Sequence, residues 1–468
     1  MLGDPTVTRV RDGGILPAVS RRLDQLRHDA ISMYDAAIRG VEPSRALTQA
    51  LATTPPPERV RLIALGKASY AMAAAAVQHL DRLDVPIAGG LVVTPDAGSP
   101  PDPRLIRVAG DHPLPGRNST AAAGALAVAV AEIEPREDVW VLLSGGTTSL
   151  IGAPVSEVSP TEYLVLIRAL GQSGLPIGDL NRVRKRFSQW GAGRLAHALR
   201  AATLRVFALS DVPGDDLADI GSGPTAPDPS TAGEIRRILQ RVPRSVTVPD
   251  FAWRVLDRVE RGDLPETPKP ADSAFAGVRS RVIGSNAVAR VHAAERARAL
   301  GYQVVETDTL LTGDAAEAGR TLGRLVAADA GGPRAWIWGG ETTVSLGEDH
   351  GLGGRCQELA IAAAEILAAT ASDQDIVLLA GGTDGRDGPT EAGGAVVDRH
   401  SWAAIRAAGL DPSRALARHD AHPALASIGG LLRPGLTGTN VMDIVIAVTG
   451  DARDLQGKAP LREPKIGA

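Results

Sequence analysis

The chain has 468 residues, a formal net charge of −4 from 50 Lys and Arg against 54 Asp and Glu, and a single cysteine, Cys356. This balance excludes a long-range basic field for nucleic acid or an anionic membrane, and one cysteine excludes an internal disulfide or a multi-cysteine zinc site. No signal-peptide pattern and no apolar run of about 18 residues is present, so we expect a cytoplasmic protein with a small-molecule ligand, either a monomer or a homodimer.

The chain is too long for one hydrophobic core, and short apolar runs alternate along it with alanine-rich helical stretches. This alternation predicts an α/β fold of two Rossmann-like three-layer α/β domains, with largely parallel sheets and a cleft between the domains. The proline-rich segment Arg261–Pro270 has the composition of a connector, so we place the domains at residues 18–262 and 272–455.

The predicted strands are short apolar runs that end in glycine or small polar residues. In chain order they are Val60–Leu65, Gly90–Thr94, Leu105–Ala109, Val139–Leu143 and Val206–Leu209 in the first half, and Arg281–Ile283, Gln303–Glu306, Ala335–Trp338, Ile376–Leu379 and Asp443–Val448 in the second. In open parallel sheets, ligands bind where strands end and helices begin, so the loops after these strands are the candidate sites.

Lys67 follows the first predicted strand, beside Gly66 and at the start of a helical stretch. An ammonium there can act as a point charge on a transferring phosphoryl group, although a solvent-facing lysine at a helix start has the same local sequence. The glycine spacing before Lys67 is not that of a Walker motif. His112, in a Gly-Asp-His-Pro loop, is a candidate substrate contact, with a purely structural histidine as the alternative.

The fourth predicted strand ends in Ser144, Gly145, Gly146, Thr147 and Thr148. The two glycines let the backbone approach an anion closely, and the N–H groups and hydroxyls of the loop offer uncharged donors to phosphate oxygens. The pattern predicts a phosphate cradle, and an ordinary turn between a strand and a helix is the alternative.

Two further sites in the first half carry charge. The run Asn181-Arg182-Val183-Arg184-Lys185-Arg186 lies on a predicted helix and is either an anion clamp or a solvated face. Asp211 follows the next strand, where its carboxylate could accept the proton of an attacking hydroxyl or orient a metal. Helix capping and turn formation are the alternatives.

In the second half, Gly340 and Glu341 follow a predicted strand, and Arg355 opens a helix after a glycine-rich loop. A guanidinium held in that way offers a bidentate fork to phosphate or carboxylate, with a surface pair to Glu358 as the alternative. Asp384 and Asp387 lie in another glycine-rich loop, which suits either Mg²⁺ or simple turn formation.

Taken together, these loops resemble the glycerate 2-kinase family, whose C-terminal part is the MOFRL domain. The resemblance extends from Gly66-Lys67 to Asp443. The segments that carry it are Gly110–Pro115, Leu143–Gly146, Asn181–Lys185, Ser210–Asp216, Ser222–Thr225, Gly339–Val344, Gly353–Arg355 with Gln357–Leu359, and Thr383–Thr390, and it ends at about Gly438–Asp443.

The resemblance implies transfer of the ATP γ-phosphoryl to the 2-hydroxyl of glycerate, or of a related hydroxy or sugar acid, with Mg²⁺. It implies that Lys67 and Arg355, one from each domain, are catalytic. Our own hypothesis from the residues adds Asp211 as the candidate base. Candidate contacts to phosphate or substrate are His112, Ser144, Gly145, Gly146, Thr147, Thr148, Asn181, Arg184, Ser188, Asn286, Gly340 and Glu341, and candidate metal contacts are Asp384 and Asp387.

The chain departs from the family pattern at three places. Gly191 stands where the pattern has a lysine, Cys356 replaces an asparagine, and Thr147-Thr148 replace a smaller Gly-Ser pair. Loss of one charge-assisted hydrogen bond would cost ~1.5–3 kcal/mol, so a different acceptor, or a protein that binds a metabolite without turnover, stays open. A hydroxypyruvate reductase is the other alternative, but no predicted strand leads into the G-x-G-x-x-G pattern of dinucleotide binding.

Overall fold

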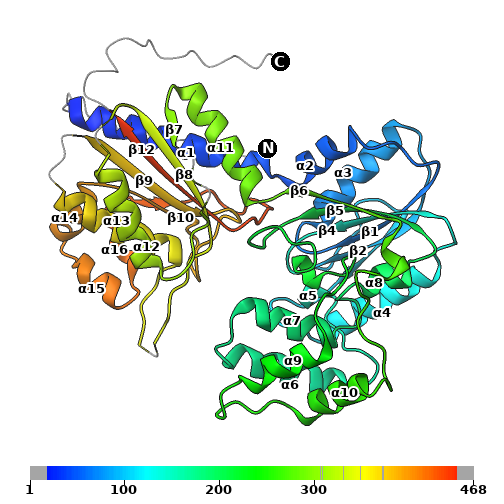
Figure 1. Ribbon diagram of the computed structural model, residues 1–468. Coiled ribbons are helices and arrows are strands. Elements are labelled where there is room, and N and C mark those ends of the chain that lie inside the picture. Colours follow the sequence, from blue (N-terminus) through cyan, green and yellow to red (C-terminus); the bar gives the residue numbers. More distant parts are fainter. Residues whose placement is uncertain are drawn as a thin grey trace, which may run out of the picture.

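The computed structural model describes residues 18–305, 307, 309–329, 331–347, 349–370 and 374–450. Within them the chain forms two six-stranded sheets, each covered by helices on both faces, which confirms the expected α/β architecture (Figure 1). Each predicted strand coincides with an observed one. Glu306, the last residue of one predicted strand, and residues 451–455 of the expected second domain lie outside the described residues.

The first sheet is parallel throughout, with strand order β3-β2-β1-β4-β5-β6. Its strands are β1 (Val60–Leu65), β2 (Ile87–Thr94), β3 (Leu105–Ala109), β4 (Asp138–Leu143), β5 (Thr203–Leu209) and β6 (Val278–Gly284). Leu62 of β1 packs into the core cluster on one face of the sheet, and Ile63 into the cluster on the other. Burial on both faces explains why the strand reads as an almost continuous apolar run.

Helices cover both faces of this sheet. They are α2 (Pro43–Leu51) and α3 (Ser69–Arg82) on one face, and α4 (Arg117–Ala131), α5 (Thr147–Leu150) and α8 (Arg194–Ala198) on the other. Two short 3₁₀ turns, η1 (Ile220–Ser222) and η2 (Ser273–Phe275), also belong to this half. Glu42 caps α2, because its carboxylate accepts the N–H groups of Ser44 and Arg45 at 3.0 and 2.7 Å.

Four more helices form an apolar cluster of their own below the first sheet in Figure 1. They are α6 (Pro160–Gln172), α7 (Ile177–Phe187), α9 (Ala232–Gln240) and α10 (Asp250–Glu260). Phe187 of α7 meets Phe251 of α10 edge to face, with ring centroids 5.8 Å apart. This packing fixes the apolar face of α7 and leaves its polar residues on the other side.

The second sheet has strand order β11-β10-β9-β12-β8-β7. Its strands are β7 (Gln303–Val305), β8 (Arg334–Gly340), β9 (Asp375–Gly382), β10 (Gly394–Asp398), β11 (Leu431–Leu432) and β12 (Asp443–Gly450). In the described part of the sheet only β7 and β8 pair in parallel. The expectation of largely parallel strands is therefore wrong for this sheet, because an apolar run that is buried on both faces does not reveal its direction.

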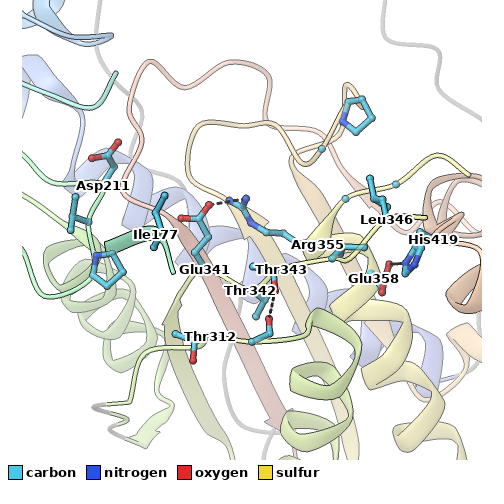
Figure 2. Close-up of a pocket in the computed structure, with 18 of the residues that line it drawn as sticks. Ile177, Asp211, Thr312, Glu341, Thr342, Thr343, Leu346, Arg355, Glu358 and His419 are labelled. Carbon is cyan, nitrogen blue, oxygen red and sulfur yellow. Dashed lines mark hydrogen bonds and ion pairs between the residues drawn. The ribbon is translucent and has the colours of Figure 1, made fainter. Parts of the chain in front are cut away.

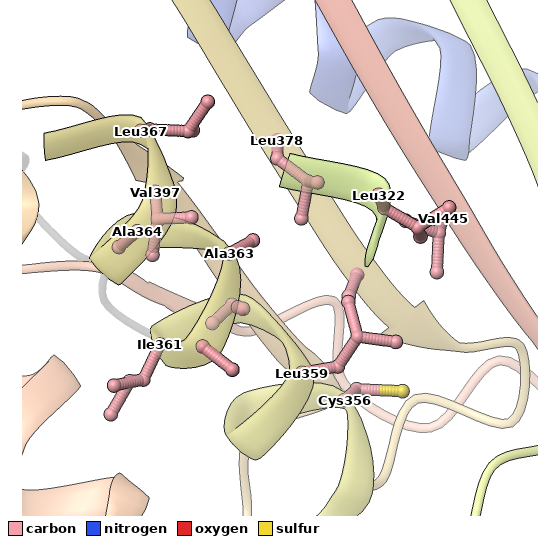
Figure 3. Close-up of a cluster of buried hydrophobic side chains, with 14 of the residues drawn as sticks. Leu322, Cys356, Leu359, Ile361, Ala363, Ala364, Leu367, Leu378, Val397 and Val445 are labelled. Carbon is pink, nitrogen blue, oxygen red and sulfur yellow. The ribbon is translucent and has the colours of Figure 1, made fainter. Parts of the chain in front are cut away.

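The helices of the second sheet are α1 (Ala18–Gly40) and α11 (Asn286–Leu300) on one face, and α12 (Ala315–Ala327), α13 (Arg355–Ala369), α14 (Ser401–Ala407), α15 (Pro412–Ala417) and α16 (Ala421–Ala426) on the other. Figure 3 shows the cluster around α13, in which Leu359 and Leu367 share one core with Leu378 of β9. Because α13 is almost entirely buried, the position of its first residue, Arg355, is fixed by the core.

The expected domain boundaries need two corrections. Helix α1 packs on the second sheet, where Tyr34 Oη donates to the carbonyl of Gly382 at 2.6 Å and Arg22 pairs with Asp375 at 2.7 Å. Strand β6 is the edge strand of the first sheet, parallel to β5. The chain therefore crosses between the halves near Val41 and again near Ser285, since sheet pairing and not the composition of the connector decides where a segment packs.

No helix in the described ranges is both long and apolar enough to cross a membrane.

Candidate active site

Three loops of the first sheet meet at one edge. The register pairs Leu65 with Leu143 and Leu143 with Ala208, so the loops after β1, β4 and β5 begin side by side. Two hydrogen bonds join the first two loops: Lys67 N–H donates to the carbonyl of Gly145 at 2.9 Å, and Ala68 N–H donates to Ser144 Oγ at 3.0 Å. The loops that sequence reasoning singled out thus form one structure.

Lys67 is exposed and lies against Gly146. A side chain at Gly146 would begin 3.1 Å from Lys67 Cγ and 3.3 Å from His112 Cδ2, and Gly146 itself has a φ of 85°. Only glycine suits that position, because the conformation is left-handed and the space is taken. His112 lies at the same corner of the site, next to Gly146 and Lys67, and burial and then the charge of Lys67 lower its pKa.

Asp211 lies over the same loop, with its carboxylate against the α-carbon of Gly145. Burial raises the pKa of Asp211, whereas a hydrogen bond from its own backbone N–H and the charge of Lys67 act in the opposite direction. A half-buried carboxylate with a raised pKa beside a lysine has the properties of a proton acceptor in a cleft.

The hydroxyls of the predicted phosphate cradle have different environments. Ser144 and Thr147 are buried, and Thr147 Oγ1 donates to the carbonyl of Ser144 at 2.8 Å. Thr148 Oγ1 lies 2.8 Å from Ser222 Oγ and lines the cavity described below, as does Gly146. The open part of the cradle is therefore the Gly146–Thr148 side.

The polar residues of helix α7 differ in whether they reach the cavity. Asn181 lines the cavity, whereas Arg184 is half-buried and does not line it. Burial lowers the pKa of Arg184. Lys185 is buried, with its ammonium 3.4 Å from Asp219 and 3.7 Å from Asp228. Ser188 follows the end of the helix, and its Oγ accepts the N–H of Gly191 at 3.1 Å.

On the second sheet, the site is built around Arg355. Its Nε and Nη2 donate to the two oxygens of Asp443 at 2.6 and 2.9 Å, and its Nη1 pairs with Glu341 Oε1 at 2.9 Å. Asp443 begins β12 and lies in register between Gly340 and Gly382, the ends of β8 and β9. Gly340 thus forms the backbone beside the site, and Glu341 follows it into the cavity.

Asp387 and Asp384 have local backbone partners. Both oxygens of Asp387 accept N–H groups from the first turn of α13, Cys356 at 3.1 Å and Gln357 at 2.8 Å. Burial raises the pKa of Asp387 to about 6 even though these two hydrogen bonds favour the ionised form. Asp384 accepts the N–H of Arg386 at 2.9 Å. Both carboxylate oxygens of Asp387 are therefore used to cap α13. This does not support its predicted role as a metal contact.

In the part of the chain that the structure describes, no three His, Cys, Asp or Glu side chains are grouped so that they could hold a metal ion by themselves. Of the predicted contacts with a carboxylate, Glu341 lines the cavity described below, whereas Asp384 does not. Mg²⁺ commonly binds through one or two carboxylates together with phosphates of a substrate. These residues fit a metal that arrives with a nucleotide better than a preformed metal cage.

Asn286, a predicted substrate contact, begins α11 and is buried. Its amide donates to the carbonyls of Val441 and Asp443, both at 2.9 Å. Its oxygen lies against the α-carbon of Gly339 and has no hydrogen-bond partner among the described residues. The structure places Asn286 behind Asp443, as a support for the start of β12.

A cavity of about 1010 Å³ opens between the two halves. The first half contributes Gly146, Thr148, Ile177, Gly178, Asn181, Asp211, Val212, Pro213, Asp219 and Gly221, and the second contributes residues that include Thr312, Glu341, Thr343, Leu346, Arg355, Glu358 and His419. In Figure 2, Glu341 lies between Asp211 on one wall and Arg355 on the other. Lys67 does not line this cavity itself but contacts Gly146, which does.

Sequence reasoning missed three residues of this site. Asp443 had entered only as the start of a strand and the end of the family resemblance, and His419 had no assigned role. Glu358 had entered only as a possible surface partner of Arg355, but it shares a hydrogen bond of 3.0 Å with His419 on the cavity wall instead. An acidic residue at the start of an apolar central strand was the available signal for Asp443, since a carboxylate at that place needs a cationic partner.

Two family models match the chain. A domain of unknown function, DUF4147, matches residues 29–257, and the MOFRL family matches residues 334–443. A glycerate 2-kinase from Pyrococcus horikoshii is 32% identical over 92% of this chain and 98% of its own length. A D-glycerate 2-kinase from Thermotoga maritima is 35% identical over 91% of this chain and 99% of its own length.

The chain belongs to the glycerate 2-kinase family. The crystal structure of a glycerate kinase from Thermotoga maritima superposes with a TM-score of 0.80 at 34% identity, covering 91% of this chain and 99% of that one. Other relatives bear the name hydroxypyruvate reductase. In this chain, however, β1 leads into Gly66-Lys67-Ala68-Ser69, which lacks the glycine spacing of dinucleotide binding.

The departures from the pattern of the glycerate 2-kinase family lie at defined places. A side chain at Gly191 would begin 3.1 Å from the carbonyl of Ser222 and 3.2 Å from Ser188 Cβ, next to the hydroxyl pair of Thr148 and Ser222. Cys356, in the first turn of α13, is buried and does not line the cavity, but its thiol hydrogen-bonds with the carboxylate of Asp443, the buried partner of Arg355. The departure at Gly191 therefore lies beside the site, and the one at Cys356 lies behind it, against the carboxylate that orients Arg355.

Proposed function

We propose that the protein is an ATP-dependent kinase that phosphorylates the 2-hydroxyl of glycerate, or a hydroxyl of a closely related small hydroxy acid, in the cavity between its two halves. The proposal has one main support: Asp211 and Arg355 line opposite walls of that cavity, and Lys67 adjoins the Asp211 wall. Phosphoryl transfer needs such an arrangement, because the protein mainly positions the reactants and neutralises charge.

In the proposed reaction, the substrate hydroxyl oxygen attacks the γ-phosphorus of ATP while its proton passes to Asp211. The bond between the γ-phosphorus and the β–γ bridging oxygen breaks, and ADP leaves with that oxygen. Lys67 and Arg355 neutralise the charge that develops on the transferred group. The raised pKa of Asp211 brings its basicity closer to working pH, which suits a general base.

The glycine loop after β4 would hold phosphate oxygens through Gly146 and Thr148, the members of the loop that line the cavity. Mg²⁺ would accompany the nucleotide and neutralise its phosphate charge, held on the protein side by Asp384 or Glu341. Asn181, from α7, would contact the acceptor or the nucleotide from the same half of the cavity as the glycine loop.

The proposal is tested by ADP release from ATP and Mg²⁺ with a panel of hydroxy acids that includes D-glycerate and several sugar acids. We expect ADP formation that depends on the acceptor, together with no oxidation of NADH or NADPH in the presence of hydroxypyruvate. Oxidation of either nicotinamide by hydroxypyruvate would favour a reductase. Calorimetric binding of a hydroxy acid without any ADP release would favour a binding protein.

A further inference from the structure

Arg355 has two carboxylate partners that differ in burial and geometry. Asp443 accepts two hydrogen bonds, at 2.6 and 2.9 Å, and its side chain is only 6% exposed. Glu341 makes a single contact at 2.9 Å, and its side chain is 44% exposed. A bidentate buried pair holds a guanidinium in one plane, whereas a single exposed pair contributes little and exchanges readily.

Asp443 cannot easily leave Arg355. It starts β12, where its backbone is paired on both sides, with Gly340 and with Gly382, and its carbonyl accepts the amide of Asn286. The Nε and Nη2 edge of Arg355 is therefore occupied by a fixed carboxylate. The Nη1 group remains for the cavity, and both Arg355 and Glu341 line that cavity.

Glu341 stands among other negative charges. Burial is the main cause that raises the pKa of Glu341; Arg355 acts against it, and the charges of Asp443, Asp211 and Asp384 raise it further. Its contact with Arg355 is the only ion pair of Glu341 in the described part of the chain. An anion that took its place on Arg355 Nη1 would leave Glu341 free to turn toward solvent or toward a cation.

We propose that Glu341 is an exchangeable counter-ion of Arg355: it competes with a phosphate oxygen of the nucleotide for the Nη1 group, while Asp443 keeps the guanidinium oriented. This inference rests on the proposed function only in taking the nucleotide phosphate as the competing anion. Arg355 would then bind an anion through Nη1 only when Glu341 is displaced. The affinity for the anion depends on how strongly Glu341 holds that group.

The two carboxylates should therefore have opposite effects on anion binding. Glu341→Gln removes the competitor and should tighten the binding of Mg²⁺-free ADP by about threefold to tenfold. Asp443→Asn loosens the guanidinium and should weaken the same binding. If both carboxylates only repelled the phosphate through space, both substitutions would tighten binding, so the sign for Asp443→Asn separates the two explanations.

The experiment is calorimetric titration of Mg²⁺-free ADP into the full-length protein at constant ionic strength, without an acceptor. Glu341→Gln is measured alone and in an Arg355→Gln background, Asp443→Asn is measured alone, and thermal unfolding of each variant shows that it is folded. Glu365→Gln is the matched control, because Glu365 pairs with Arg320 at 2.9 Å with a side-chain exposure of 37% and lies on α13 outside the cavity.

We expect the gain in affinity for Glu341→Gln with Arg355 present, a gain below about twofold when Arg355 is Gln, and no change for Glu365→Gln. Equal gains in both backgrounds, no gain at all, or no ADP binding by any variant would contradict the inference. Failure of the kinase proposal gives a different result: the gain would appear here, but no hydroxy acid would support ADP release in the turnover assay.

Discussion

The carboxylate of Asp211 packs against the α-carbon of Gly145, so that a side chain at position 145 would occupy the place of the Asp211 oxygens. We predict that Gly145→Ala displaces Asp211 and lowers kcat/KM by ~10²-fold, since a shift of about 1 Å in a reacting group costs that much. Steady-state ADP release measures the effect.

The control for this variant is Gly124→Ala in α4, where no atom lies within 4 Å of the added methyl group. Gly124→Ala should leave turnover unchanged and raise the free energy of unfolding by about 0.5–1 kcal/mol, because alanine favours a helix interior. Full activity in Gly145→Ala would show that the position of Asp211 is not important for the reaction.

The pH profile of kcat/KM should report Asp211. Burial raises its pKa and Lys67 lowers it, so activity should rise with pH as the carboxylate ionises, above the ordinary range of an aspartate. Lys67→Met removes the opposing charge and should move the acidic limb to higher pH in whatever activity remains. An acidic limb that keeps its position in Lys67→Met, or that persists in Asp211→Asn, would assign it to another group.

Asp387 should couple stability to pH. Burial raises its folded-state pKa to about 6, from an ordinary value of 3.8, so the folded state binds this proton more tightly than the unfolded chain. The free energy of unfolding of the natural protein, relative to that of Asp387→Asn, should therefore rise by up to ~3 kcal/mol as the pH falls from about 6 to about 4. Urea unfolding at several pH values measures it, and a constant difference would contradict the shift.

Gly191 offers a test of the departure from the family pattern. Gly191→Lys adds an ammonium beside the Thr148–Ser222 pair, at the cost of close contact with Ser188 and the Ser222 carbonyl. If glycerate is the acceptor, kcat/KM should rise about tenfold or more. Gly191→Ala carries the same crowding without the charge and should show no gain; a gain in both variants, or in neither, would mean that the ammonium has no role there.

The strand ends and their loops could be predicted from the sequence because their signals are local. An apolar run followed by glycines marks the end of a buried strand, and this was sufficient to locate the loops of Lys67, Gly145 and Asp211 in the first sheet. Their meeting at one edge then follows from parallel pairing, which the register of β1, β4 and β5 confirms.

The partners of Arg355 and the position of helix α1 depend on contacts between segments that are far apart in the sequence. Arg355 and Asp443 are 88 positions apart, and they meet only because β12 runs antiparallel between β8 and β9, a direction that its apolar sequence does not encode. Helix α1 packs on the second sheet through a similarly distant contact, since Tyr34 and Gly382 are 348 positions apart. The pairing of Arg355 with Glu341 and Asp443 was therefore beyond prediction, although Glu341 was a predicted contact and the acidic start of β12 indicated a cationic partner.

The central claim is that Lys67 and Arg355, from separate halves, act on one phosphoryl group. The most direct measurement is ADP release with D-glycerate for Lys67→Ala and Arg355→Ala beside the natural protein, with thermal unfolding as the check on folding. We predict that each variant keeps its fold and loses ~10²–10³-fold in kcat/KM. Full turnover in both variants would contradict the claim.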